Sequence, residues 1–211
     1  MKLATEKILA DVSDGIGWLT FNQPEKRNAM SMEMWQGVAD AFEAFQADPS
    51  VRVVVMHGAG GKAFVSGADI SEFDAHRANA EQKAHYNAVT STGKDWLAKI
   101  DKPLVAMIQG FCIGGGLAVA LNADVRIATE GSRFGIPAAK LGLGYDFAGM
   151  STLARLVGPS VARDMLFSAR FLTADEALRV GLINRVVPEA DLDSEVDRKS
   201  TRLNSSHVAL S

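Results

Sequence analysis

The sequence predicts an α/β fold in which helices flank a core sheet. Short apolar runs bounded by glycine or proline alternate along the chain with segments whose apolar residues recur at helical spacing. Alternation of this kind is typical of α/β proteins. The chain has 211 residues, of which 47% are hydrophobic and 22% are charged, so it has an ordinary globular composition and enough length to bury a core.

The first predicted elements are a hairpin and a helix. Two strands, residues 7–12 and 15–21, flank an Asp-Gly pair, which is a strong signal for a tight hairpin turn. A polar loop follows. Ser31 can then cap a helix, because its side chain accepts a hydrogen bond from a free backbone N–H. The helical spacing of apolar residues continues to Asp48, and the proline after it ends the helix.

The middle of the chain predicts two buried strands with a long helix between them. Residues 51–58 and 103–110 are continuous apolar runs, which is the pattern of strands buried on both faces. Residues 81–100 carry apolar side chains on one helical face. A glycine-rich loop after the first strand contains a short strand-like segment, residues 63–65.

The second half of the chain continues the alternation. Thr173 and Glu176 form a capping box at the start of the last helix of this region. The expected elements are a helix at 117–122, a strand at 124–129, helices at 151–157, 160–167 and 173–180, and a strand at 182–187.

The composition excludes several classes of protein. A formal net charge of −3 provides no basic patch for nucleic acid, and no zinc-ligand spacing is present. A single cysteine, Cys112, excludes an internal disulfide and fits a reducing compartment. The amino terminus has no signal-peptide core, and no apolar run approaches the ~20 residues that cross a bilayer. We therefore expect a soluble cytoplasmic protein with no metal site and no nucleic-acid or membrane partner.

Two glycine-bearing loops share one layout, in which a buried strand is followed by glycine and the start of a helix. They are residues 64–69, "FVSGAD", and residues 113–117, "IGGGL". Backbone N–H groups at a helix start are unpaired, and two of them aimed at one point form an oxyanion hole. Alternatively, both loops are tight turns that pack helices on strands. The order of the glycines matches neither a dinucleotide fingerprint nor a P-loop.

Four motifs lie in order between about residues 15 and 187. They read "FNQPEKRNAMSMEMW", "AFVSGADISEF", "KPLVAMIQGFCIGGGLAVALNADVRIATEGSRFGIP" and "ARLVGPSVARDMLFSARFLTADEALRVGLINRVVP". Together they resemble the crotonase family, that is, the enoyl-CoA hydratases and isomerases. The resemblance implies a spiral of ββα units and an acyl-CoA thioester substrate. It also implies an oxyanion hole in which the amides of Ala68 and Gly115 hold the thioester carbonyl.

The same matching implies which residues bind the substrate. Lys26 or Arg27 would lie near the CoA phosphates, although taken alone both residues have the character of solvated charges. No cofactor is implied beyond coenzyme A, which is part of the substrate, and the implied assembly is a homotrimer or a dimer of trimers. The implied substrate-binding residues are Lys26, Arg27, Ala29, Ser66, Ala68, Asp69, Ile70, Ser71, Gly114, Gly115, Ala138 and Tyr145.

The sequence departs from the family where the hydratases carry two catalytic glutamates. Those positions are Ala118 and Ala138, and neither methyl group can move a proton. Asp146, in register with the following "LARLVG", resembles the carboxylate used by the thioester hydrolases and the 4-chlorobenzoyl-CoA dehalogenases of the family. It could act as general base or nucleophile, or it could cap the next helix. Tyr145 could donate a proton or line the pocket wall.

Two functions of different class follow from this pattern. The first is a crotonase-family enzyme acting on an acyl-CoA, through an Asp146-dependent hydrolysis-type reaction or a weak hydration by water placed in the pocket. The second is an acyl-CoA-binding or scaffold protein without turnover. Residues 1–192 are expected to form the acyl-CoA-binding domain. Residues 193–211 are polar and predict a disordered tail in place of the C-terminal helices of the family.

Overall fold

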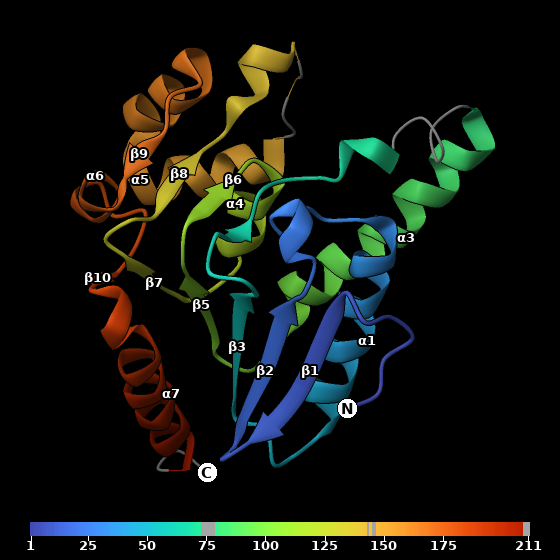
Figure 1. Cartoon of the computed structure of the whole chain (residues 1–211), viewed down its shortest axis with the longest axis vertical. Helices are drawn as coiled ribbons and strands as arrows, with labels where there is room; N and C mark the ends of the chain where they lie inside the picture. Colours follow the sequence, from blue (N-terminus) through green and yellow to red (C-terminus); the bar gives the residue numbers. More distant parts are fainter. Residues whose placement is uncertain (73–78, 143, 145–146, 209–211) are drawn as a thin grey trace.

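The computed structural model describes residues 1–72, 79–142, 144 and 147–208. Six strands form the large sheet in these residues, in the spatial order β1 (Ile8–Ser13), β2 (Ile16–Phe21), β3 (Val53–Gly58), β5 (Leu104–Ile108), β7 (Val125–Thr129) and β10 (Arg185–Val187) (Figure 1). The strands β1 and β2 form the predicted antiparallel hairpin. All other neighbours in this sheet run parallel.

A second sheet in the described residues holds four strands: β4 (Ala63–Val65), β6 (Phe111–Ile113), β8 (Arg133–Gly135) and β9 (Leu172–Thr173). The strands β4, β6 and β8 follow β3, β5 and β7 along the chain, so each turn of the chain adds one strand to each sheet. This arrangement confirms the predicted α/β fold and its spiral of ββα units. The strand β4 was predicted, whereas β6, β8 and β9 were not. Strands of two or three residues are too short to show a reliable period.

Every predicted helix is present in the described residues, whereas α7 and the short helices η1–η4 were not predicted. Ser31 caps α1, since its Oγ accepts a hydrogen bond from the Met34 amide at 3.1 Å. Gly158, with φ of 78°, interrupts α5 at the boundary between the two helices predicted there. No helix of the described residues combines the length and the apolar character that a bilayer crossing requires. The bounds are η1 (Pro24–Lys26), α1 (Met32–Ala47), η2 (Ile70–Glu72), α3 (Ala80–Lys99), α4 (Gly115–Ala120), η3 (Pro137–Leu141), α5 (Phe147–Ser168), α6 (Ala174–Arg179), η4 (Glu189–Asp191) and α7 (Leu192–Val208).

The large sheet is apolar on both faces. Along β3, Val54 and Met56 belong to the core beneath α1, whereas Val53 and Val55 belong to the core on the opposite face. The two sets alternate because successive side chains of a strand point to opposite faces. The helices α1 and α3 lie together on one side of the sheet, and α7 lies on the other (Figure 1).

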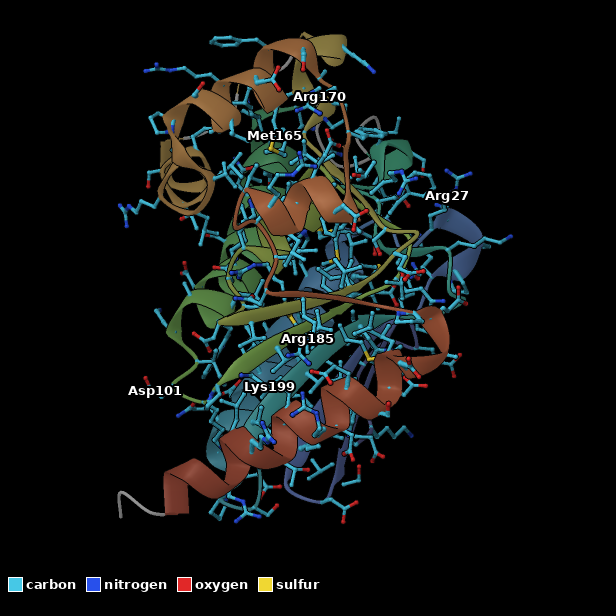
Figure 2. The ribbon with its side chains drawn as sticks, turned by 90° about the vertical axis from the view of Figure 1, so that its left-hand side faces the viewer. Arg27, Asp101, Met165, Arg170, Arg185 and Lys199 are labelled. Carbon is cyan, nitrogen blue, oxygen red and sulfur yellow. The ribbon has the colours of Figure 1, made fainter. Side chains whose placement is uncertain are left out.

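The predicted disordered tail, residues 193–211, is helical from residue 193 to residue 208 as part of α7, so that prediction is wrong for these residues. Leu192, Val196 and Leu203 lie near one face of α7 and pack against the large sheet, and the fully buried Ser200 lies between them in the sequence. Arg185 of β10 also forms an ion pair with Glu195 at 2.7 Å (Figure 2). The prediction missed the helix because most of its residues are polar, and few apolar positions mark the buried face.

Candidate active site

The two glycine-bearing turns meet in the structure. Met30 and Ala68 form an isolated parallel bridge, in which the Met30 amide donates to Gly67 O at 2.8 Å and the Asp69 amide donates to Met30 O at 2.9 Å. Since the N–H of Ala68 is trans to the Gly67 carbonyl across one planar peptide, it points away from Met30. An ideal β-carbon on Gly115 would lie 3.7 Å from the Ala68 nitrogen, so the start of α4 faces this amide.

Glycines allow the two turns to approach each other. A β-carbon on Gly116 would lie 2.0 Å from the Val65 carbonyl oxygen, which means that α4 rests directly on the end of β4. Gly67 has φ of 122° and Gly114 has φ of 57°, which are backbone conformations that other residues adopt only with strain. The glycines of both motifs therefore fix a close backbone contact between turns that are far apart in the sequence.

Both amide groups are available to a ligand. Gly115 is the first residue of α4, so its N–H has no acceptor within the helix. Within the part of the chain that the structure describes, neither the Ala68 nor the Gly115 N–H donates to a backbone acceptor. Ala68 is exposed to solvent. Two such donors can stabilise an oxygen atom that gains negative charge when both point towards it.

A buried carboxylate lies next to Ala68. Asp69 is 6% exposed, and its Oδ2 accepts a hydrogen bond from Lys26 Nζ at 2.7 Å. Its Oδ1 accepts from the Ser71 amide at 3.1 Å and from Ser71 Oγ at 2.5 Å. Burial disfavours the ionised carboxylate, but the hydrogen bonds from Lys26 and Ser71 outweigh burial and lower the pKa of Asp69 to about 2. The hydrogen bond to Asp69 also raises the pKa of Lys26.

Other predicted substrate-binding residues lie around these turns. Arg27 is exposed at the outer edge of the molecule, with its guanidinium 5.3 Å from the centroid of the Phe111 ring (Figure 2). Ser66 Oγ donates to Lys26 O at 3.4 Å. Ile70 is 70% exposed, and Ala29 is half-buried. The structure therefore brings the "PEKRNAM" segment and the "SGADIS" segment together, and their contact with a substrate stays a prediction.

The positions linked to proton transfer are only partly described. Ala118 lies one turn into α4, where its amide donates to Gly114 O at 3.1 Å. Ala138 lies in η3 and is 6% exposed. Neither side chain titrates. Tyr145 and Asp146, the predicted alternatives, lie outside the described residues.

Asn28 supports the site and was missed by the sequence analysis. It is fully buried with φ of 57°, and its Oδ1 accepts from the Gln23 amide at 2.9 Å. Its Nδ2 donates to Ala59 O at 3.0 Å and to Ala63 O at 2.8 Å. The hydrogen bonds of Asn28 thus hold the loop that carries Lys26 and Arg27 against the start of β4. Asparagine tolerates left-handed backbone conformations, so an asparagine within a polar loop is the signal that could have identified it.

A cavity of about 280 Å³ lies at the carboxyl ends of β2, β3 and β5. His57 and Thr20 line it, with His57 Nε2 and Thr20 Oγ1 2.8 Å apart. Burial lowers the pKa of His57, and the nearby Asp193 partly opposes this effect. The glycines that line the cavity precede β4 in the chain, and the residues that line it include neither Ala68 nor Gly115. The described residues contain no group of three His, Cys, Asp or Glu side chains that could hold a metal ion.

Known proteins resemble this chain in both sequence and fold. The crotonyl-CoA hydratase of Syntrophomonas wolfei is 34% identical over 203 residues, which cover 96% of this chain and 77% of that protein. The short-chain-enoyl-CoA hydratase of Clostridium acetobutylicum is 34% identical over 88% of this chain and 70% of its own length. The crystal structure of an enoyl-CoA hydratase/carnithine racemase from Magnetospirillum magneticum matches with a TM-score of 0.89 and 38% identity, over 95% of this chain and 75% of that one.

A family model agrees with these individual relatives. The model described as enoyl-CoA hydratase/isomerase matches residues 11–210, a range that includes both glycine-bearing turns and α7. The match, the identities above 30% and the shared fold lead to one conclusion. The chain belongs to the enoyl-CoA hydratase/isomerase family, the crotonases, and is an enzyme of that family.

Proposed function

We propose that this protein binds an acyl-CoA thioester and polarises its carbonyl between the amide N–H groups of Ala68 and Gly115. The observation that carries the proposal is the contact between the two glycine-bearing turns, where a β-carbon on Gly115 would lie 3.7 Å from the Ala68 nitrogen. The family relatives named crotonyl-CoA hydratase and short-chain-enoyl-CoA hydratase support an enoyl-CoA as the substrate.

Two backbone donors suit this chemistry because they act where charge develops. When a nucleophile adds to the β-carbon of an enoyl thioester, the carbonyl oxygen becomes an enolate oxygen. When a nucleophile adds to the carbonyl carbon, the same atom becomes the oxyanion of a tetrahedral intermediate. Hydrogen bonds from fixed N–H groups strengthen as that charge grows, and they therefore lower the barrier to either reaction.

The step that follows polarisation separates two candidate reactions. Hydration needs a base for water and an acid for the α-carbon, and neither Ala118 nor Ala138 can supply one. This observation favours, as a second candidate, hydrolysis of the thioester with Asp146 as general base or nucleophile. As general base, Asp146 takes a proton from the water that attacks the carbonyl carbon, and it returns this proton to the sulfur as the sulfur–carbon bond breaks, which releases coenzyme A as the thiol. As nucleophile, Asp146 attacks the carbonyl carbon and displaces the coenzyme A thiolate; water then hydrolyses the resulting acyl anhydride, which restores the carboxylate and supplies the proton for the thiol.

Carbonyl polarisation can be measured without turnover. Crotonyl-CoA labelled with ¹³C at the carbonyl is titrated into the protein, and the labelled C=O stretch is followed by difference infrared spectroscopy. We expect saturable binding with a shift of the stretch to lower wavenumber, because hydrogen bonds weaken the C=O bond. Saturable binding with an unshifted stretch would refute the proposed oxyanion hole, and absence of binding across an acyl-CoA panel would refute the substrate class.

The same samples distinguish the candidate reactions. Loss of the enoyl absorbance reports hydration, and appearance of a free thiol reports hydrolysis. A thiol signal that disappears in the Asp146→Asn variant supports hydrolysis by that carboxylate. A shifted carbonyl without either product supports the acyl-CoA-binding alternative.

We also propose that the chain assembles as a homotrimer or a dimer of trimers, as its family resemblance implies. Phe167 and Phe171 are 78% and 40% exposed in the single chain and offer apolar surface that a neighbouring copy could cover. Light scattering coupled to size-exclusion chromatography tests the assembly, and a monomer at micromolar concentration would contradict it.

A further inference from the structure

We infer that Asp69 is a positioning residue, which acts with Lys26 to hold the Ala68 amide in the direction that a thioester carbonyl requires. The inference rests on the proposed function of Ala68. It differs from the role that the family resemblance implied for Asp69, which was to bind the substrate. A side chain that is 6% exposed, and whose carboxylate oxygens both accept hydrogen bonds from the protein, has little surface left for a ligand.

The peptide that carries the Ala68 N–H needs an external anchor. Gly67 precedes it, and at φ of 122° this residue has conformational freedom that a side chain would remove. One anchor is the hydrogen bond from the Met30 amide to Gly67 O, which sits on the opposite edge of the same peptide. The bridge is short, since Met30 and Ala68 are paired outside any strand. A short bridge beside a glycine does not fix a peptide plane alone.

Asp69 makes two further contacts with the segment that carries Met30. Its amide donates to Met30 O, and its Oδ2 binds the ammonium of Lys26, which precedes Met30 in the same loop. Gln23 Nε2 approaches the same oxygen at 3.5 Å. The bridge between the two segments is therefore held by a backbone bond and by an ion pair. Rotation of the Gly67–Ala68 peptide would break the hydrogen bond from the Met30 amide to Gly67 O. The two Asp69 contacts oppose that rotation because they hold the segment that carries Met30 against this peptide.

A second carboxylate ties the same two segments together. Glu72 Oε2 accepts from the Met32 amide at 2.9 Å, so η2 is fastened to the start of α1. The two contacts differ in their distance from the proposed donor. Asp69 is the immediate neighbour of Ala68, and Glu72 is not. The carboxylate of Asp69 is thus the one whose loss should turn the Ala68 amide.

The experiment compares Asp69→Asn with a matched control. Asp164→Asn removes a carboxylate from the exposed Arg170–Asp164 ion pair, which has the same 2.7 Å separation but belongs to α5. For each protein we would measure the melting temperature, the dissociation constant for ¹³C-crotonyl-CoA, the bound carbonyl shift, and kcat and KM on any acyl-CoA that the wild type turns over. Lys26→Met provides a second disruption of the same ion pair.

We expect Asp69→Asn to bind crotonyl-CoA while losing most of the carbonyl shift, and kcat to fall about 10- to 100-fold, because a small misplacement of a catalytic group has an effect of that order. Asp164→Asn should keep the wild-type shift and kcat. A merely structural role would lower the melting temperature and leave the shift of the bound carbonyl unchanged. That result would overturn the inference, as would a wild-type kcat in Asp69→Asn.

Failure of the proposed function gives a different result. If the wild type itself shows no shift, the oxyanion hole is refuted before any variant is made. If Asp69→Asn does not fold, Lys26→Met decides the matter. A reduced shift in folded Lys26→Met supports the inference, and a full shift overturns it.

Discussion

Adding one methyl group at each of two adjacent glycines separates packing from chemistry in the "GGG" turn. In Gly115→Ala the new β-carbon would meet the Ala68 nitrogen at 3.7 Å, which is ordinary van der Waals contact. In Gly116→Ala it would lie 2.0 Å from the Val65 carbonyl oxygen and 2.7 Å from the Val65 carbonyl carbon. Those are backbone atoms, so the overlap is relieved only if α4 moves away from β4.

The two variants should therefore differ in stability. Gly115 is a helical residue with ordinary φ, and glycine-to-alanine changes at such positions stabilise proteins by about 0.4–1 kcal/mol. Gly116→Ala overpacks a rigid contact, and we expect a loss at or above the usual ~1–3 kcal/mol for overpacked cores. The melting temperature of Gly115→Ala should equal or exceed that of the wild type, whereas that of Gly116→Ala should fall clearly.

The chemistry should follow the reverse order among folded proteins. A carbonyl oxygen must come within about 3 Å of the Ala68 nitrogen to accept its hydrogen bond, and the added methyl of Gly115→Ala stands beside that nitrogen. Loss of one oxyanion donor typically lowers the rate about 10²- to 10³-fold, or about 3–4 kcal/mol. We expect Gly115→Ala to lose the carbonyl shift of bound crotonyl-CoA and a rate of that order.

Calorimetry and infrared difference spectra test both parts on the same samples. A Gly115→Ala protein that is folded, binds crotonyl-CoA and keeps the full shift would show that the oxygen does not lie between these turns. A Gly116→Ala protein as stable as the wild type would show that α4 does not rest on Val65.

Three further predictions concern stability and reactivity. The pKa of Asp69 falls from its ordinary value of 3.8 to about 2 on folding, so the unfolded state binds more protons between these values. The resulting stabilisation, about 2 kcal/mol, should be complete above pH ~5 and lost as the pH falls through 4 towards 2. In denaturant titrations, the difference in free energy of unfolding between the wild type and Asp69→Asn should therefore decrease at low pH. Ser31→Ala should lower the free energy of unfolding by about 1 kcal/mol in the same titrations, because it removes the cap of α1. Cys112 is fully buried and burial raises its pKa, so a thiol reagent should modify it only as fast as the protein unfolds; rapid labelling of the native protein would contradict this burial.

The parts of the fold that the sequence predicted are those governed by local rules. The Asp-Gly hairpin, the Ser31 cap and the Thr173 capping box each depend on residues within four positions of one another. The glycine turns were also visible, because consecutive glycines at a helix start are locally unfavourable and demand an explanation. That Gly116 packs against Val65, however, is a contact between distant segments that only the structure supplies.

The parts that the sequence did not predict depend on tertiary contacts. The strands β6 and β8 exist because they pair with one another, and three residues alone have no strand signal. One face of α7 packs against the large sheet. This contact stabilises the helix, whereas an isolated helix with so few apolar residues would be marginal in water. The pairing of Asp69 with Lys26 joins residues 43 positions apart and has no local signal, whereas the family resemblance implied only a substrate contact for Asp69.

The donors proposed for the carbonyl are main-chain groups, whereas the proton-transfer positions of the hydratases are side chains, and these two components can be lost separately. Any residue except proline keeps a backbone N–H, so alanine at positions 118 and 138 removes acid–base groups and leaves both amides in place. Acid–base catalysis contributes about 10²–10⁴ in rate, and an oxyanion donor about 10²–10³. A chain with only the second component should therefore polarise crotonyl-CoA as a hydratase does and hydrate it about 10²- to 10⁴-fold more slowly. A hydration rate typical of hydratases would require another proton-transfer group at the polarised carbonyl, and loss of that rate in Asp146→Asn would identify it.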